Sequence, residues 1–236
     1  MIFKPNTNKE LKKAVDLWCN DKEKALEQYG EINTWNTINI TSMQNLFHNK
    51  ICFNDNISNW NTINVRDMSG MFNECDKFNQ PLNNWNTSNV YYMDYMFFGC
   101  KEFNQVLNNW DTSNVYTINY MFNKCTKFNQ SLNNWNIVNV DNISYMFYGC
   151  INFNQPLNKW NTVNVIDASY MFCGCEKFNQ DLDNWDLKSL KKCDKMFHEC
   201  RSYSYALFSW TDYDPIMNTQ IFDRAINKKS FKAKSI

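Results

Sequence analysis

Cysteine is the residue type in this chain with the most scope for chemistry, because ten cysteines occur among 236 residues. Six of them stand 25 residues apart, at Cys75, Cys100, Cys125, Cys150, Cys175 and Cys200. Zinc sites gather cysteines in C-x-x-C pairs, which neither this spacing nor the neighbouring Cys173 and Cys175 provide. Equivalent cysteines in stacked units would lie about 5 Å apart, within disulfide reach, but their Cβ atoms would point the same way. The spacing predicts reduced thiols that pack a core and hold no metal.

Residues suited to acid–base or nucleophilic catalysis do not converge in the sequence. The two histidines, His48 and His198, fall at equivalent positions of distant repeats, and neither has a serine or cysteine placed around it as in a catalytic triad. Carboxylates recur in no fixed pair, and the chain has no glycine-rich phosphate loop. We therefore expect a protein that is not an enzyme and has no catalytic, cofactor-binding or metal-binding residues.

The elements that position these side chains follow from a 25-residue period that runs through most of the chain. Tryptophan recurs at Trp35, Trp60, Trp85, Trp110, Trp135, Trp160, Trp185 and Trp210. One phenylalanine series runs through Phe47, Phe72, Phe97, Phe122, Phe147, Phe172 and Phe197, and a second through Phe53, Phe78, Phe103, Phe128, Phe153 and Phe178. No insertion interrupts these series, and a fixed period of this length is typical of a solenoid or a similar array.

One repeat unit, residues 78–100, reads FNQPLNNWNTSNVYYMDYMFFGC. From Val90 its apolar residues recur at steps of three and four, which predicts a short helix or helical turn that ends near Gly99. Pro81 lacks the N–H that a central strand needs, so we expect the strand to follow it, from Leu82 to Asn86. The predicted fold class is a repeat solenoid of the α/β, leucine-rich-repeat-like type. Each 25-residue coil has one short helix or helical turn and one short parallel strand, and a helical N-terminal cap covers the array.

Two columns of polar groups need partners inside such an array. One is an asparagine column, comprising Asn54, Asn79, Asn104, Asn129, Asn154 and Asn179. We expect its side-chain amides to satisfy backbone groups at a tight corner rather than to bind a ligand. The other is the tryptophan column, whose indole N–H groups must find acceptors at the edge of each coil.

Three segments are expected along the chain. Residues 1–30 lack the repeat and read as a helical N-terminal cap, with Thr7 and Glu10 as a capping-box pair before an apolar helical pattern. Residues 31–210 form the solenoid, with seven 25-residue repeats from Trp35 to Trp210. Residues 211–236 are expected to be a C-terminal cap and a lysine-rich tail.

The best candidate for a binding surface is a further aromatic column, predicted to lie on the outer face of the helical side. It comprises Tyr95, Tyr120, Tyr145 and Tyr170, with Tyr91, Tyr92 and Tyr116 beside it. Outside these middle repeats the column holds Asn45, Gly70 and Lys195 instead. Tyrosine is enriched at protein interfaces, so the column predicts a partner-binding face. The alternative interpretation is a stacked ladder that stabilises the rod and contacts nothing else.

Charge and hydropathy exclude several classes of partner. Lysine plus arginine equals aspartate plus glutamate at 24 each, so no basic excess is present to follow a nucleic-acid backbone. No apolar run reaches the roughly 20 residues that span a bilayer, and the first ten residues contain no hydrophobic leader. An intracellular or virion location is therefore expected in preference to secretion.

The repeat resembles that of the BspA-like surface-protein family, which carries a mycoplasma-lipoprotein type of leucine-rich repeat. The resemblance covers residues 31–210 and rests on three motifs that recur in phase, W-[ND]-T-x-N-V, M-F-x-x-C and F-N-Q-x-L. The segment ending Tyr29-Gly30-Glu31-Ile32 is also similar to the leader often found before such arrays. Members occur on bacterial surfaces and in large DNA viruses, and the resemblance implies adhesion or protein–protein contact rather than catalysis.

These observations lead to one expected function and one alternative. The expected function is a non-catalytic protein–protein interaction scaffold, of adhesion or adaptor type, that binds a protein partner through one face of the solenoid. The alternative is a passive structural component of a virion or surface layer. Self-association is a further expectation, because an uncapped end of such an array presents unpaired backbone groups.

Overall fold

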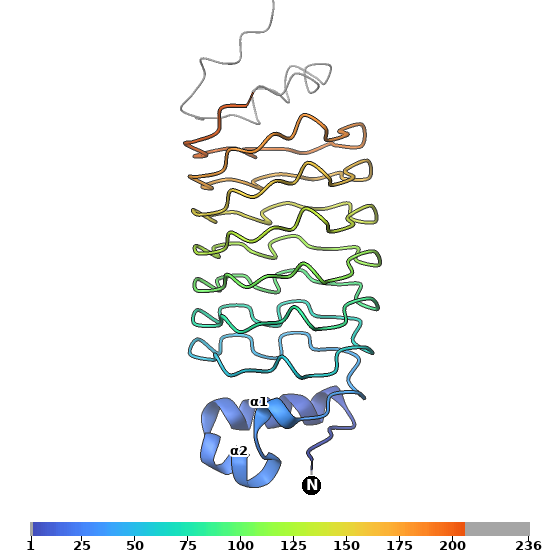
Figure 1. Ribbon diagram of the computed structural model, residues 1–236, viewed down its shortest axis with the longest axis vertical. Coiled ribbons are helices and arrows are strands. Elements are labelled where there is room, and N and C mark those ends of the chain that lie inside the picture. The colour runs from blue at the N-terminus through green and yellow to red at the C-terminus, as the bar shows by residue number, and fades with distance from the viewer. Residues whose placement is uncertain (1, 206–236) are drawn as a thin grey trace, which may run out of the picture.

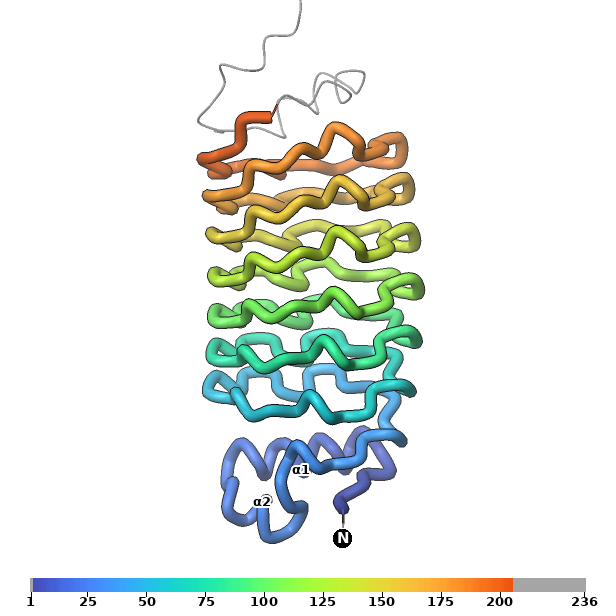
Figure 2. The backbone as a smooth tube through the Cα atoms, viewed as in Figure 1, coloured from blue at the N-terminus to red at the C-terminus, as the bar shows by residue number. Residues whose placement is uncertain are grey.

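The structure is a computed structural model that describes residues 2–205. Two α-helices, α1 (Asn8–Asn20) and α2 (Lys22–Tyr29), and a 3-10 helix, η1 (Ile32–Thr34), come first along the chain. The remaining described residues wind into coils that stack along the long axis of the molecule, with the helices at one end (Figures 1 and 2). Trp210 and the C-terminal cap expected at residues 211–236 lie outside the described residues.

The helical segment forms where the sequence predicts a cap, and its first cap is the expected one. The Thr7 side chain accepts a hydrogen bond from the Glu10 N–H at 3.1 Å, and the Glu10 carboxylate accepts one from the Asn6 N–H at 2.7 Å. The next helix begins at Asp21, whose side chain accepts from the Lys24 N–H at 3.1 Å. Gly30, with a φ of 69°, ends the helix in the left-handed region that favours glycine.

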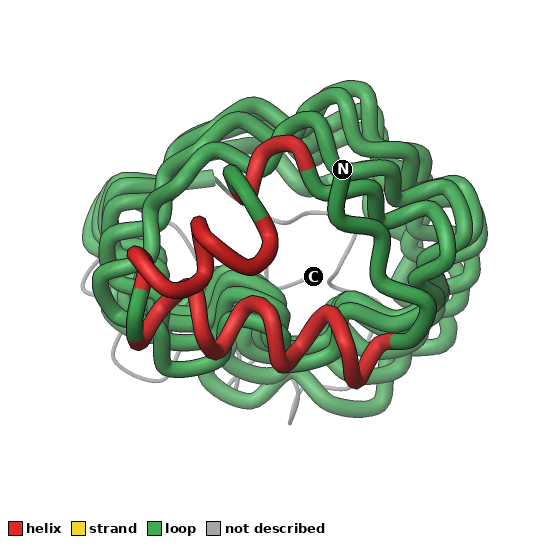
Figure 3. The backbone as a smooth tube through the Cα atoms, turned by 90° about the horizontal axis from the view of Figure 1, so that it is seen from below, coloured by secondary structure: helices red, strands yellow, loops and turns green. Residues whose placement is uncertain are grey.

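Helix α1 covers the first coil and occupies backbone groups that another coil would otherwise pair. The Asn8 side-chain oxygen accepts from the N–H groups of Thr41 and Ser42 at 3.2 and 3.3 Å. The Lys12 ammonium donates to the Leu46 carbonyl at 3.1 Å. The Trp18 ring packs edge-on against Trp35, with centroids 5.8 Å apart. Seen along the stack, the helices lie across the end of the coils (Figure 3), so this end presents fewer unpaired groups to a second chain.

The sequence predicts a short helix or helical turn from Val90, and no helix forms in any coil after residue 34 of the described chain. The segment instead folds as consecutive turns, in which Met96, Phe98 and Cys100 each donate to the carbonyl three residues earlier at 3.0–3.3 Å. The intervening N–H groups point along the stack: those of Met93, Tyr95, Phe97 and Gly99 donate to the next coil at 2.8–3.1 Å. An α-helix would use these donors within its own segment, so the hydrogen bonds between coils exclude it.

The strand expected at Leu82–Asn86 also lies elsewhere. Parallel bridges link successive coils at a single column, comprising Ser42, Asp67, Tyr92, Thr117, Asn142, Asp167 and Lys192. No strand longer than one residue occurs among the described residues. In the predicted strand the Trp85 N–H donates to the Leu82 carbonyl of the same coil at 3.0 Å, so it does not pair with a neighbouring coil. Side chains make the hydrogen bonds between coils there: the Thr87 hydroxyl donates to the Asp111 carbonyl at 2.9 Å.

The core consists of identical side chains stacked from coil to coil. Both phenylalanine series stack nearly parallel; Phe72 and Phe97, for example, have centroids 5.6 Å apart and planes 6° apart. The tryptophans find the acceptors that the sequence required: Trp110 Nε1 donates to the Leu82 carbonyl at 2.9 Å, and five other tryptophans make the same bond 28 residues back. Each coil therefore contributes a ring face and an acceptor to the next one.

The asparagine column forms the ladder that the sequence predicts. Each side-chain oxygen accepts from the backbone N–H of the equivalent residue in the following coil, which is Ser204 for Asn179 and an asparagine for the others. The Asn104 N–H donates to Asn79 at 3.0 Å and the Asn129 N–H to Asn104 at 2.9 Å. The adjacent glutamine adds a second donor, as Gln130 Nε2 does to Asn104 at 3.0 Å. The column therefore satisfies backbone donors at a corner where consecutive coils do not pair through their backbones.

Replacing Asn104 with alanine tests this ladder. Asn104→Ala leaves the Asn129 N–H and the Gln130 amide without their acceptor. We expect the free energy of unfolding to fall by about 1–3 kcal/mol, the usual cost of an unsatisfied part-buried donor. Denaturant titration measures it. Asn104→Asp keeps an acceptor oxygen and should lose distinctly less; equal losses in both variants would contradict the role of that oxygen.

Candidate functional site

The predicted aromatic column forms a continuous stack on the outside of the turns. Tyr95, Tyr120, Tyr145 and Tyr170, here called the tyrosine ladder, have successive ring centroids 4.6, 4.5 and 4.6 Å apart. Their planes differ by only 7–10°. Tyr95 is 36% exposed, and the other three are half-buried. The rings are thus closer to one another than the stacked rings within either phenylalanine series of the core, whose neighbours lie 5.4–6.1 Å apart.

An unusual backbone conformation carries the ladder. All four tyrosines have positive φ values, from 56° to 60°. This is the φ expected at the third residue of a type II turn, where glycine is preferred, and Gly70 occupies the same column with a φ of 61°. The left-handed conformation costs a residue with a side chain about 1–2 kcal/mol. Stacked aromatic pairs contribute about 0.5–1.5 kcal/mol each, so the stack offsets much of this cost.

The stack determines which part of each tyrosine a partner can reach. Because the rings are parallel and nearly touching, neighbouring tyrosines cover each other's faces, and the edges and hydroxyl groups remain. At one end Lys195 places its ammonium 5.9 Å from the Tyr170 ring centroid. At the other end Gly70 contributes no side chain, and the Asn45 amide occupies the space where its Cβ would be. The ladder therefore offers a row of phenol edges rather than slots for a planar ligand.

The other predicted tyrosines form a second group earlier in the same coils. Tyr91 and Tyr116 stack at 5.9 Å, and Tyr91 meets Tyr92 edge-on at 6.4 Å. Tyr92 and Tyr116 are 46% and 49% exposed, which makes them the most open tyrosines of the described residues. All seven predicted residues therefore lie at least partly exposed on consecutive coils. Phe98 and Tyr148 flank the ladder, at 5.9 Å from Tyr95 and 5.8 Å from Tyr145.

Sequence reasoning missed one charged group beside the ladder. Asp94 precedes Tyr95, its carboxylate accepts a hydrogen bond from the Thr117 hydroxyl, and its second oxygen is buried without a partner in the described part of the chain. Burial raises the pKa of the Asp94 carboxyl, although the Thr117 hydrogen bond opposes this shift. Equivalent coils carry Ser69 or Ser144 at this position. A comparison of the repeats column by column would have identified Asp94 and Asp194 as the two acidic residues in a column of neutral polar ones.

Stacking also changes the acidity of the phenols. Partial burial, together with the neighbouring Tyr120 and Tyr170, raises the pKa of Tyr145 from the usual 10.0 to about 12. The phenols of Tyr95 and Tyr120 have pKa values raised by burial as well.

The raised pKa of Tyr145 predicts a loss of stability at high pH. Between about pH 10 and about pH 12 the unfolded chain has lost this proton while the folded chain keeps it, so the free energy of unfolding falls as pH rises. Denaturant titrations across that range, with phenolate absorbance recorded in parallel, measure the effect. Tyr145→Phe keeps the ring without the proton and should show a shallower decline; identical declines would contradict the assignment.

The cysteine column packs the core as predicted. Cys100 is fully buried, and its Sγ donates to the Phe72 carbonyl of the preceding coil at 3.0 Å; five other cysteines of the column do the same. Burial raises the pKa of the Cys100 thiol well above its usual value. All ten cysteines are free thiols, and residues 2–205 contain no group of three histidine, cysteine or acidic side chains placed to hold a metal ion.

Thiol labelling separates these buried cysteines from the exposed one. Cys52 is exposed, whereas Cys100, Cys125 and Cys150 are fully buried. In the native protein we expect iodoacetamide to modify Cys52 rapidly and the buried column only after unfolding, because alkylation needs an accessible thiolate. Mass spectrometry of timed samples gives the order. Rapid modification of the column in native protein would contradict its place in the core.

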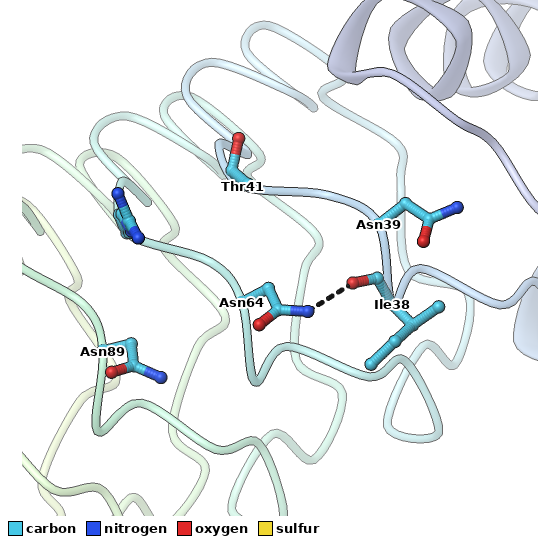
Figure 4. A pocket seen from close by; sticks show the side chains of 6 residues that line it. Ile38, Asn39, Thr41, Asn64 and Asn89 are labelled. Atoms are coloured by element: carbon cyan, nitrogen blue, oxygen red, sulfur yellow. Dashed lines mark hydrogen bonds between the residues drawn. The ribbon is translucent and has the colours of Figure 1, made fainter.

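The surface depressions of the described residues offer little for a ligand. One is lined by Ile38, Asn39, Thr41, Asn64, Arg66 and Asn89. Within it the Asn64 amide donates to the Ile38 carbonyl at 2.7 Å (Figure 4). The Asn89 amide makes the same bond to the Ile63 carbonyl of the preceding coil, so these amides are part of a second hydrogen-bonding column. His48 and His198 lie in different coils and approach no common centre.

The 25-residue period and the bridges that link equivalent residues of successive coils show that this is a repeat protein. A family model described as "Mycoplasma protein of unknown function, DUF285" matches residues 19–135 and 117–234, so the chain belongs to that family. Comparisons with curated proteins and with solved structures found no match. No helix of residues 2–205 has the length and apolar character needed to cross a membrane.

Proposed function

We propose that this repeat protein is a leucine-rich-repeat-like solenoid of the BspA-like type that acts as a non-catalytic interaction scaffold. Its partner is a protein that docks on the tyrosine ladder and on the neighbouring Tyr91, Tyr92 and Tyr116. One observation carries the proposal: tyrosine occupies an exposed column only in the middle coils, although Asn45, Gly70 and Lys195 fill the same column elsewhere. The tryptophan and phenylalanine columns of the core, in contrast, keep their residue type in nearly every described coil.

The form of the ladder indicates what kind of surface would bind it. Phenol edges and hydroxyl groups combine apolar contact area with hydrogen-bonding capacity, which is why tyrosine is frequent at interface hot spots. Stacking holds each ring by its neighbours, so binding would order few side chains and cost little conformational entropy. Charges of both signs lie near the ladder. Asp94 is hydrogen-bonded and Asp167 acts on the Tyr120 phenol, while Lys195 covers the last ring and Lys124 lies 5.7 Å from the Phe98 ring. A neutral partner surface with apolar and hydrogen-bonding groups fits this face.

The alternative function is a passive structural component of a virion or surface layer. The observation that favours it is energetic, since the stack offsets the cost of four left-handed tyrosines and so has a use within the rod itself. A ladder of this kind would need no partner. The two proposals differ in one respect: a scaffold uses the phenol hydroxyls and ring edges to bind a partner, whereas a structural component needs only the stacked rings.

A capture experiment separates the two functions. The bait is the full chain, compared with two quadruple variants at Tyr95, Tyr120, Tyr145 and Tyr170, one with serine and one with phenylalanine. The phenylalanine variant keeps the stack and loses only the hydroxyls, so it controls for folding. For a scaffold we expect a partner that binds wild type more tightly than the serine variant by about thirtyfold or more, as loss of a hot spot of 2 kcal/mol or more implies.

The readout is quantitative mass spectrometry of captured proteins, followed by a binding titration with the purified partner. Circular dichroism and unfolding midpoints of each variant establish that the rod is intact. Equal capture by the wild type and by a folded serine variant would refute the tyrosine-ladder proposal. It would leave the structural component as the better account.

A further inference from the structure

We propose that the tyrosine ladder is a site of oxidative cross-linking, in which neighbouring tyrosines of successive coils couple to dityrosine when a peroxidase and hydrogen peroxide supply the oxidant. The product is a covalent link between residues 25 positions apart in the chain. This modification is independent of any protein partner and goes beyond the proposed scaffold function.

The geometry that points to this chemistry is the close approach of several phenols in one accessible row. Three neighbouring pairs have ring centroids 4.5–4.6 Å apart. Coupling requires two phenoxyl radicals to meet within their lifetimes, and a fixed neighbour at this separation replaces a slow encounter between molecules. Partial exposure leaves the ring edges, which carry the reacting ortho carbons, open to solvent and to an oxidant.

The reaction balances with hydrogen peroxide alone. The oxidised peroxidase removes one electron from each of two tyrosines, and each phenol releases its hydroxyl proton, which gives two phenoxyl radicals. A carbon–carbon bond forms between the ortho positions of the two rings. The two ortho hydrogens then move to the oxygens and restore both aromatic phenols. Hydrogen peroxide accepts the two electrons and two protons and becomes two water molecules, so the protein loses two hydrogen atoms for each link.

Tryptophan, methionine and the thiols of the cysteine column are less accessible than the ladder, whereas Tyr92 and Tyr116 are more exposed than it. Every tryptophan and methionine of residues 2–205 is buried. The thiols of the cysteine column are buried too, and their pKa values are raised, which disfavours the reactive thiolate. Cys52 is the exposed thiol, so a Cys52→Ser background removes the competing reaction. Two other tyrosine pairs compete with the ladder: Tyr145 with Tyr148 at 5.8 Å, and Tyr91 with Tyr116 at 5.9 Å.

The link would give the rod a covalent reinforcement that its cysteines do not provide. All ten cysteines are free thiols, so only non-covalent contacts hold successive coils together. A dityrosine bond between coils restricts the unfolded chain in the way that a disulfide does, and it should raise the midpoint of thermal unfolding.

The test uses the full chain in a Cys52→Ser, Tyr148→Phe background, which removes the exposed thiol and the tyrosine that flanks Tyr145. It is treated at low concentration with peroxidase and hydrogen peroxide. Dityrosine fluorescence gives the yield, and mass spectrometry of peptides locates the links. The key variant is Tyr120→Phe with Tyr170→Phe, which keeps the ring stack but leaves no two tyrosines adjacent in the ladder. The matched control is Tyr91→Phe with Tyr116→Phe, which removes the competing pair and leaves the ladder unchanged.

We expect links between Tyr95 and Tyr120, Tyr120 and Tyr145, or Tyr145 and Tyr170 within single chains, with a higher unfolding midpoint. The yield should fall by about tenfold or more in the Tyr120→Phe, Tyr170→Phe variant and stay near the wild-type level in the control. An equal yield in the two variants would overturn the proposal. So would peptide maps dominated by other tyrosines or by links between separate chains.

Discussion

Hydrogen bonds between the backbones of successive coils are the constraint on which the rest of this structure depends. In each turn segment every second N–H, such as those of Met93, Tyr95 and Phe97, donates to a carbonyl of the following coil. These bonds hold only if equivalent residues face each other, so one inserted residue would misalign every later coil. The unbroken 25-residue period of the sequence is the consequence of this register. The same bonds explain the absence of a helix, because the donors are already used.

Side chains complete the pairing where the backbones do not meet. Threonine hydroxyls, asparagine amides, tryptophan indoles and cysteine thiols each donate to or accept from the adjacent coil at one fixed position. Buried polar groups are costly without partners, so these columns repeat as strictly as the apolar ones. Ile137 is an exception in the threonine column, and it replaces the hydrogen bond with apolar burial. Helix α1 takes the place of a preceding coil for the first coil: Asn8 accepts from the Thr41 N–H, and Lys12 donates to the Leu46 carbonyl.

The tyrosine ladder arises because the same register aligns equivalent side chains on the surface of successive coils. Stacking by identical coils brings equivalent side chains together, so a tyrosine retained at one position becomes a row of nearly parallel rings. The third residue of the turn favours glycine, yet four coils carry tyrosine there at a cost in backbone energy. This combination gives the rod one face on which aromatic edges gather. The proposed recognition of a partner and the proposed oxidation of the phenols both depend on that face, and they would require different properties of it.

The sequence by itself determined the period, the stacked columns, the buried cysteines, the asparagine ladder and the seven tyrosines of the candidate face. All of these depend on which residues are equivalent, and equivalence is visible in the spacing alone. The sequence placed the pairing between coils at Leu82–Asn86, whereas the structure has it at Tyr92. The segment from Val90 forms turns and no helix. Local apolar spacing does not distinguish a helix from successive turns, because both bring residues three apart to one side. Only the tertiary structure decided between them. The same N–H groups can bond within the segment or to the neighbouring coil, and in the stacked array they bond to the neighbouring coil.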